Sequence, residues 1–144
     1  MSGGSDVFDA IVVGAGPSGS TAAWRLARAG VDVLLVDGSA FPRSKPCGEA
    51  ISPGATPLLA EMGVLARLRQ QGATAIGRWR LRTPDGRFVS ASFGPAVDDV
   101  PAAGLALSRR RFDAVLLDAA RTAGARFRCL LYTSDAADEE DSVD

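Results

Sequence analysis

The chain has no histidine and only two cysteines among its 144 residues. Without histidine there can be no Ser-His or Cys-His catalytic pair and no histidine-ligated metal. Cys47 and Cys129 are too few for a disulfide framework or a four-cysteine zinc site, so we expect no metal. No apolar run reaches the length of a membrane span, and residues 1–6 lack the basic and apolar regions of a secretory signal. We therefore expect a cytoplasmic setting.

Lysine is scarce as well, because all basic residues except Lys45 are arginine. Residues 1–128 hold 16 basic and 11 acidic side chains, a net charge of +5, and the other six acidic residues lie in the last sixteen positions. A mildly basic body suits an anionic ligand such as a dinucleotide. The charge is too weak and too scattered to predict nucleic acid as a partner.

Three segments near the N-terminus predict a βαβ unit. Residues 7–13 and 32–36 are short runs rich in Val, Ile and Leu, typical of buried strands. Residues 17–29 predict a helix, with Pro17 in its first turn and Gly30 as its C-terminal stop. Two strands joined through one helix pair in parallel with a right-handed crossover, so the predicted fold class is α/β.

The middle of the chain alternates between loops and short elements. Residues 38–57 and 94–104 are rich in Pro and Gly, and we expect long loops there. Between these loops, residues 58–71 predict one or two short helices. Alternating patterns over residues 76–83 and 87–93 predict a β-hairpin.

The strongest helical periodicity lies at residues 108–123, which predict an amphipathic helix with Ser108 as its N-cap. The residues expected on its buried face are Phe112, Val115, Leu116 and Ala119. After this helix, residues 125–131 would begin a third parallel strand.

The clearest chemical signal is a glycine-rich turn between the first strand and the first helix. Its residues are Gly14, Ala15, Gly16, Pro17, Ser18 and Gly19. The first glycine permits a tight turn, the second lets the backbone approach a pyrophosphate, and the third lets the helix pack closely on the strand. Asp37 ends the second strand, where a carboxylate can accept both ribose hydroxyls and would repel a 2′-phosphate. The motif predicts a dinucleotide site and leaves NAD and FAD open, because both carry the same ADP half.

Three stretches together carry a resemblance to a known family. They are VVGAGPSGSTAAWRLARAG with Asp37, FPRSKPCGEAISPGA, and LSRRRFDAVLLDAARTAGA, and they span most of residues 7–128. They resemble FAD-dependent oxidoreductases of the geranylgeranyl reductase family, within the wider group of flavoproteins of the para-hydroxybenzoate hydroxylase type. The second stretch is the specific one, since the first is shared with many flavin and nicotinamide enzymes.

The resemblance implies FAD as the cofactor and assigns residues to it. Ser18 and Asp37 would contact the ADP moiety, as part of the glycine-rich turn and the strand end. Cys47 and Gly48 would lie along the flavin, and Arg109 would reach the pyrophosphate or the ribityl chain.

Some of these assignments have a plain structural alternative. Cys47 is a weak candidate for a catalytic thiol, and otherwise a small buried hydrophobe. Arg43 is expected at the cofactor, and otherwise an ordinary surface charge. Of the three consecutive arginines at 109–111, only one is expected at the cofactor, and Asp113 is expected to be structural.

The resemblance also implies a discontinuous domain organisation. Residues 1–75 would form the first part of an FAD-binding domain, and residues 76–104 the start of a β-rich substrate domain. Residues 105–128 would supply a return helix and a third strand. The Gly-Asp motif that completes the FAD site in this family is absent from the sequence. We therefore expect an incomplete Rossmann-like FAD/NAD(P)-binding fold that is inactive alone.

The last residues differ in character from the rest. Residues 129–139, CLLYTSDAADE, resemble the translation of a transposon-end adapter used in DNA library preparation. We expect residues 129–144 to be a non-native tail and the native sequence to stop at or near Arg128. The alternative is an acidic, disordered C-terminal tail.

The function implied by the resemblance is reduction of isoprenoid double bonds, with electrons from NAD(P)H or another donor. The substrate would be a small, hydrophobic molecule. The alternatives are an FAD-dependent aromatic or polyketide monooxygenase or halogenase, and a dinucleotide-binding module without catalysis. Peripheral membrane contact and oligomeric state stay open.

Overall fold

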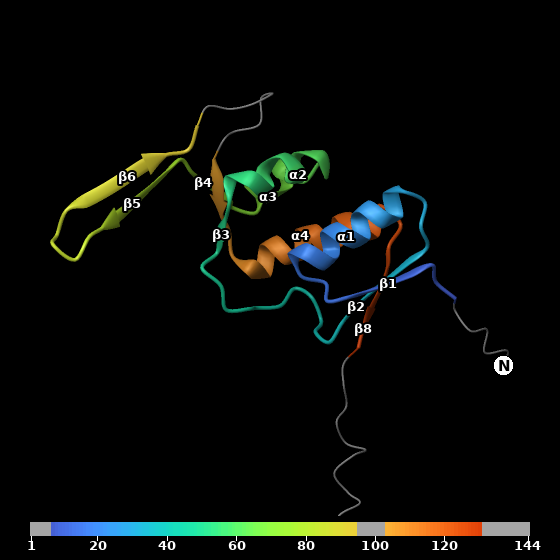
Figure 1. Ribbon diagram of the computed structural model, residues 1–144. Helices are drawn as coiled ribbons and strands as arrows, with labels where there is room; N and C mark the ends of the chain where they lie inside the picture. Colours follow the sequence, from blue (N-terminus) through green and yellow to red (C-terminus); the bar gives the residue numbers. More distant parts are fainter. Residues whose placement is uncertain (1–6, 95–102, 131–144) are drawn as a thin grey trace, which may run out of the picture.

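A three-stranded parallel sheet organises the chain, of which the computed structural model describes residues 7–94 and 103–130 (Figure 1). Strand β2 (Val33–Asp37) lies in the middle, between β1 (Ala10–Val13) and β8 (Arg126–Cys129). The βαβ unit and the third parallel strand are thus confirmed. The predicted end of the native sequence near Arg128 remains a prediction, because residues 131–144 lie outside the described ranges.

Two helices, α1 (Pro17–Arg28) and α4 (Arg109–Thr122), connect the parallel strands and lie side by side (Figure 1). Each helix turns an apolar stripe inward. The main core joins residues of β2, α1 and α4, among them Val33, Leu35, Ala23, Trp24, Leu116 and Ala120. The packing of α1 against α4 therefore brings the N-terminal and C-terminal parts of the described chain together.

Strand β1 departs from the prediction of a buried strand over residues 7–13. Val7, Ile11 and Val13 are 80%, 62% and 82% exposed, and only Ala10 and Val12 pack against the core. Within the described ranges β1 has a partner strand, β2, on one edge. Successive side chains of a strand point to opposite faces of the sheet. The alternating burial of β1 therefore means that only one of its faces is covered by the core.

A second, antiparallel sheet has the order β3-β7-β4 and was not predicted. Strand β3 (Ala50–Ile51) falls in the predicted loop 38–57, and β7 (Gly104–Ala106) begins at the last residue of the predicted loop 94–104. The strand β4 (Thr74–Ile76) completes it. Strands of two or three residues show no measurable periodicity, and their pairing depends on partners far along the chain. The predicted segment boundaries at 75 and 104 fall inside β4 and β7, and residues 95–102 lie outside the described ranges.

The short helices between the two sheets agree with the prediction. A 3₁₀ turn η1 (Pro53–Ala55) leads into α2 (Thr56–Glu61), and α3 (Leu65–Gln70) follows after a break at Gly63, whose φ is +70°. The buried residues Leu59 and Leu68 attach α2 and α3 to the main core.

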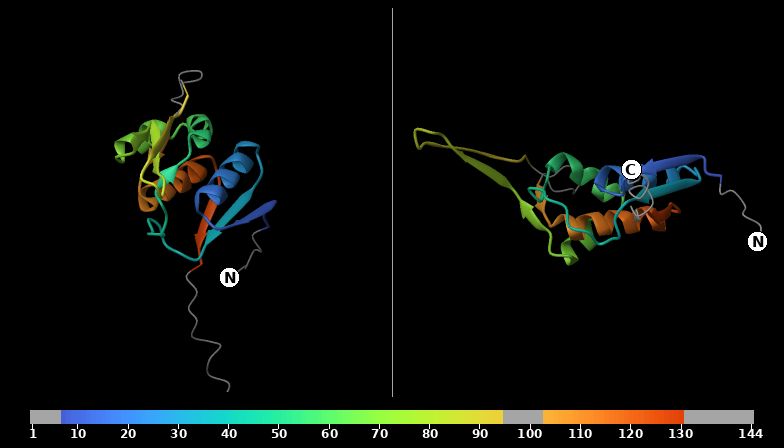
Figure 2. Two further views of the ribbon diagram at one scale, coloured as in Figure 1. Left: turned by 60° about the vertical axis from the view of Figure 1, so that its left-hand side comes forward. Right: turned by 90° about the horizontal axis from the view of Figure 1, so that it is seen from below.

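The predicted β-hairpin is confirmed as β5 (Arg78–Arg82) and β6 (Phe88–Ser92). It projects away from the rest of the chain, as the right-hand view of Figure 2 shows. Trp79, Leu81 and Val89 lie on one face of the ribbon and are 40–61% exposed. The assignment of this hairpin to the start of a substrate domain stays a prediction.

Helix α4 differs from its prediction in two details. Ser108 stands at the N-cap, but its side chain makes no capping hydrogen bond; its backbone carbonyl accepts from the N–H groups of Arg111 and Phe112. The buried face includes Asp113, which is fully buried, whereas Ala119 is half-buried. No helix within the described ranges is both long and apolar enough to cross a membrane.

Because four consecutive residues of β2 are buried, its side chains should contribute strongly to stability. We expect Leu35→Ala, at a fully buried position, to lower the free energy of unfolding by about 2–5 kcal/mol. Urea unfolding followed by circular dichroism measures this. The matched control is Leu81→Ala on the exposed hairpin, with an expected change of about 0.5 kcal/mol or less. Equal losses for the two variants would contradict the assignment of the core.

Candidate dinucleotide-binding site

The glycine-rich turn joins β1 to α1 with very little space between helix and strand. Gly14 has φ +96°, and its N–H donates a 2.7 Å hydrogen bond to the carbonyl of Val36. A Cβ added to Gly19 would lie 1.7 Å from the carbonyl oxygen of Gly14. Only glycine can occupy position 19 without moving the backbone. The predicted reason for the third glycine is therefore visible in the packing.

Gly16 is the N-cap of α1 and has an open face. A Cβ there would meet only two groups within 4 Å, the Nη2 atoms of Arg43 and Arg109, each at 3.6 Å. The first turn of α1 carries no acidic side chain. A helix N-terminus presents unpaired N–H groups and the positive end of the helix dipole. Two guanidinium groups and a helix N-terminus thus converge on one bare glycine, which is the chemistry of an anion site.

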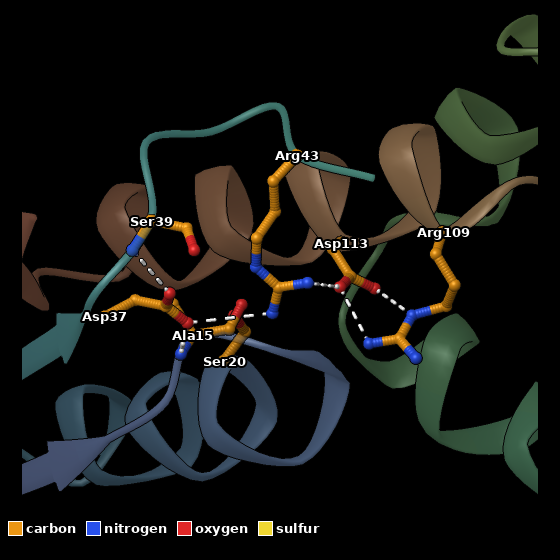
Figure 3. A network of polar contacts seen from close by, with 7 residues as sticks. All are labelled: Ala15, Ser20, Asp37, Ser39, Arg43, Arg109 and Asp113. Carbon is orange, nitrogen blue, oxygen red and sulfur yellow. Dashed lines mark hydrogen bonds and ion pairs between the residues drawn. The ribbon is translucent and has the colours of Figure 1, made fainter. Parts of the chain in front are cut away.

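Asp37 ties the end of β2 to this turn (Figure 3). One carboxylate oxygen accepts the N–H of Ala15 at 2.8 Å, and the other accepts the N–H of Ser39 at 2.9 Å. The Nη2 of Arg43 lies 3.6 Å from the first of these oxygens. The carboxylate therefore already has backbone donors on both oxygens. Its contact with ribose hydroxyls remains a prediction.

The fully buried carboxylate of Asp113 faces two arginines (Figure 3). Its two oxygens accept from Nε and Nη2 of Arg109, at 2.6 and 2.8 Å, in a bidentate pair. The Nη1 of Arg43 lies 3.3 Å from the second oxygen. This ion pair with Asp113 raises the pKa of Arg109 above its ordinary value. The sequence left open whether Arg43 is a cofactor residue or an ordinary surface charge. Its side chain is largely buried at the site, so it is not an ordinary surface charge.

Cys47 is exposed, which excludes its alternative as a small buried hydrophobe. The backbone N–H of Glu49 and the side chain of Arg109 are hydrogen-bonded to the thiol, and both lower the pKa of Cys47 below its ordinary value. Glu49 has φ +55°, the one non-glycine residue with positive φ in the described ranges. Such a conformation is rare for a side-chain-bearing residue and often accompanies a functional turn.

A cavity of about 380 Å³ lies beside the N-terminus of α1. Its polar lining residues are Ser18, Thr21, Cys47, Glu49 and Arg109. Its larger apolar lining residues are Ile51, Leu58, Leu59, Leu107, Phe112 and Leu116. Gly48 does not line this cavity and borders a neighbouring hollow with Glu49 and Arg110. The cavity is large enough for an aromatic ring system with a polar attachment.

The structure brings most of the predicted site residues together. The turn 14–19, Asp37, Arg43, Cys47 and Arg109 meet at the N-terminus of α1, while Arg111 turns away to donate to the carbonyl of Gln71. Sequence reasoning expected Asp113 to be structural and did not foresee its contacts with both Arg43 and Arg109, nor the apolar wall from α2. The signal for Asp113 was a charged residue on the apolar face of an amphipathic helix, four residues after an arginine. Residues 7–94 and 103–130 contain no cluster of acidic, cysteine or histidine side chains that could hold a metal ion.

Comparisons with known proteins agree with this geometry. A family model described as FAD binding domain matches residues 7–144. A menaquinone reductase of Mycobacterium tuberculosis (strain ATCC 25618 / H37Rv) is 38% identical over 128 residues, covering 84% of this chain and 28% of that protein. Digeranylgeranylglycerophospholipid reductase 2 of Methanopyrus kandleri is 36% identical over 137 residues, covering 94% and 31%.

Among solved structures, a myxobacterial chondrochloren halogenase, described as FAD-dependent, superposes with a TM-score of 0.77 at 30% identity. The match covers 88% of this chain and 29% of that one. The chain thus spans less than a third of the length of these three proteins. The recognition of an FAD-binding flavoprotein from its motifs is confirmed, and a digeranylgeranylglycerophospholipid reductase is among the proteins to which the chain is similar.

Gly16 and Gly19 should respond differently to the same change. Gly16→Ala meets its neighbours at ordinary contact distance, so we expect an unchanged melting temperature and lost FAD binding, because the methyl group fills the anion site. Gly19→Ala forces the helix off the turn and should cost about 1–3 kcal/mol of stability as well. Thermal melts and flavin fluorescence titrations check both. A stable Gly19→Ala variant would contradict the close packing of α1.

Cys47 should titrate below an ordinary thiol. We expect its rate of alkylation by iodoacetamide to rise with pH around a midpoint below that of an ordinary thiol, because hydrogen bonds stabilise the thiolate. A Cys129→Ser background leaves Cys47 as the one thiol. Arg109→Gln should move the midpoint upward, while the matched control Arg110→Gln, at an exposed position, should not. Equal midpoints for all three proteins would show that Arg109 does not act on the thiol.

Proposed function

The chain belongs to the FAD binding domain family, and we propose that it is the N-terminal cofactor-binding part of a flavin-dependent oxidoreductase that reduces prenyl double bonds. One observation carries the first half of this proposal. The open face of Gly16 lies between two guanidinium groups, at the start of a helix without acidic residues in its first turn. A pyrophosphate group fits this donor set, since it needs several N–H donors and positive charge at one place.

Different residues around Gly16 would bind different parts of FAD. Arg43 and Arg109 would bind the pyrophosphate together with the N–H groups at the start of α1. Asp37 lies on the side where the adenosine ribose would sit, and its charge would disfavour a ligand with a 2′-phosphate there. Cys47 and the neighbouring cavity lie on the side of Arg109, where the flavin would be placed.

When bound, FAD would be reduced by NAD(P)H or another donor and would supply the hydride that is transferred to the substrate. The chain contributes orientation and surroundings. The apolar residues of α2 and α4 would keep water from one side of the cavity, and Arg109 holds positive charge beside the Cys47 thiol. Cys47 lines the cavity, where it would border the flavin.

The substrate class rests on the relatives and on chemistry. A digeranylgeranylglycerophospholipid reductase and a menaquinone reductase are similar along 84–94% of the chain, and by name both reduce molecules that carry prenyl chains. We therefore propose a small, hydrophobic, prenyl-bearing substrate. The residues that would enclose it lie mostly outside a chain that covers less than a third of these relatives.

A second candidate is an FAD-dependent monooxygenase or halogenase. Its support is the halogenase structure, which is 30% identical to this chain over the aligned residues and superposes over 88% of this chain. Both candidates use the same cofactor site, because one fold serves several flavin chemistries. They differ in the fate of the reduced flavin, which passes hydride to a double bond in one case and reacts with oxygen in the other.

The experiment begins with long-read sequencing of the source DNA across codon 128, followed by expression of the complete reading frame. We expect a yellow protein with one FAD per chain, bleached anaerobically by NAD(P)H or dithionite. Turnover of a geranylgeranyl-bearing lipid or quinone without oxygen consumption supports the reductase. Oxygen consumption that depends on an aromatic substrate or on halide supports the second candidate. A colourless protein that takes up no FAD would overturn both and leave a non-catalytic dinucleotide-binding module.

A further inference from the structure

Asp113 connects the two cations of the site although it does not face the open side of Gly16. Arg109 precedes it by one helical turn on α4, and Arg43 comes from the irregular segment after β2. Both guanidinium groups nonetheless reach the same buried carboxylate, Arg109 through two hydrogen bonds and Arg43 through an ion pair at 3.3 Å. The Nη2 atom of each arginine is also the group nearest to Gly16.

This arrangement brings like charges together. The Nη2 atoms of both guanidinium groups lie 3.6 Å from the position that a Cβ on Gly16 would take, next to the positive end of the α1 dipole. Like charges at such distances repel, most strongly where water is excluded. Without a nearby anion, both side chains would gain by swinging out to solvent. The buried carboxylate of Asp113 offsets the repulsion before any anionic ligand arrives.

Arg43 is held at the site by ion pairs and a ring contact. Its Nε and Nη1 atoms are buried and have no hydrogen-bond partner in the described ranges. Its position rests on ion pairs with Asp113 and Asp37, at 3.3 and 3.6 Å, and on the ring of Phe41, whose centroid is 4.8 Å from the guanidinium carbon. Both carboxylates have other donors, two backbone N–H groups at Asp37 and Arg109 at Asp113, and the contact of Arg43 with Asp113 is the shorter of its two ion pairs.

We propose that Asp113 is a positioning residue for the cofactor, a single buried carboxylate that places Arg43 and Arg109 over Gly16 ready for a pyrophosphate. The inference rests on the proposed function for the identity of the anion. The inference goes beyond the proposed function because it states what holds Arg43 and Arg109 in place before the ligand binds. That residue, Asp113, would not itself contact the ligand. Preorganised donors bind an anion more tightly because less side-chain freedom is lost on binding.

The test compares Asp113→Asn with Asp118→Asn in the 144-residue chain, in a Cys129→Ser background. Asp118 is a matched control, because it lies on the same helix but is about half exposed and pairs with Arg67. We expect Asp113→Asn to weaken FAD and ADP by the same factor, about 10–100-fold, as for loss of charge-assisted hydrogen bonds. Affinity for adenosine, which has no phosphate, should not change. Unchanged FAD affinity in a folded Asp113→Asn chain would overturn the proposal.

A second measurement needs no cofactor. If Asp113 holds Arg109 in place, Asp113→Asn releases Arg109 from Cys47 and raises the pH midpoint of Cys47 alkylation. If Asp113 acted only through its own charge, its removal would lower that midpoint, because a nearby anion disfavours the thiolate. A lowered or unchanged midpoint therefore contradicts the positioning role. This readout separates the two proposals, since a complete protein that binds no FAD contradicts the proposed function, while the alkylation result decides on Asp113 without any cofactor.

Asp113→Glu covers the case in which the asparagine variant does not fold. It keeps the negative charge at the core and moves the carboxylate by one methylene group. We expect a folded chain with FAD and ADP affinity reduced and adenosine affinity retained. Wild-type affinity for all three ligands would show that the place of this carboxylate does not set the place of the arginines.

Discussion

The contact between Gly19 and the carbonyl of Gly14 decides where α1 begins relative to the sheet, and the rest of the site is built on that position. With no Cβ at residue 19, the helix lies directly on the turn. Its open N-terminus is thereby fixed at the carboxyl end of β1 and close to the end of β2. Helix α4 packs along α1, so the side chains at the start of α4 reach the same place. The absence of a side chain at Gly19 thus lets α1 pack closely on the turn, and this packing brings residues from both ends of the described chain together.

The electrostatics of the site follow from this geometry. Two buried or nearly buried carboxylates, Asp37 and Asp113, alternate with Arg43 and Arg109 along one line of contacts (Figure 3). The four charges cancel, so attraction for an anion comes mainly from the N–H groups and dipole of α1 and from the outward sides of the two arginines. The several donors around each carboxylate offset the desolvation cost of burying these ion pairs. Removal of one partner would leave an uncompensated buried charge.

Local patterns were enough to predict the elements that form the site. The run from residue 10 to Asp37 has a strand, a glycine turn, a helix and a strand in fixed order, and each depends on neighbours close in sequence. The two-residue strand β3 and the three-residue strand β7 could not be found in this way, because their pairing is a tertiary property. A Cβ on Gly104 would lie 2.6 Å from the carbonyl of Ile51, a close approach that no local pattern encodes. Asp113 was visible as an unusual residue, but its second arginine partner comes from a segment with no regular structure.

The long connection between the two halves of the site has a consequence for biogenesis. The glycine turn and Asp37 leave the ribosome early, whereas Arg109, Asp113 and strand β8 follow only after both loops and the hairpin. Until β8 pairs with β2, the nascent chain exposes the β2 edge and the inner face of α1. Domains dominated by such non-local pairing fold slowly and expose apolar surface while they wait. A site built from both halves can therefore capture a dinucleotide only after α4 has been synthesised.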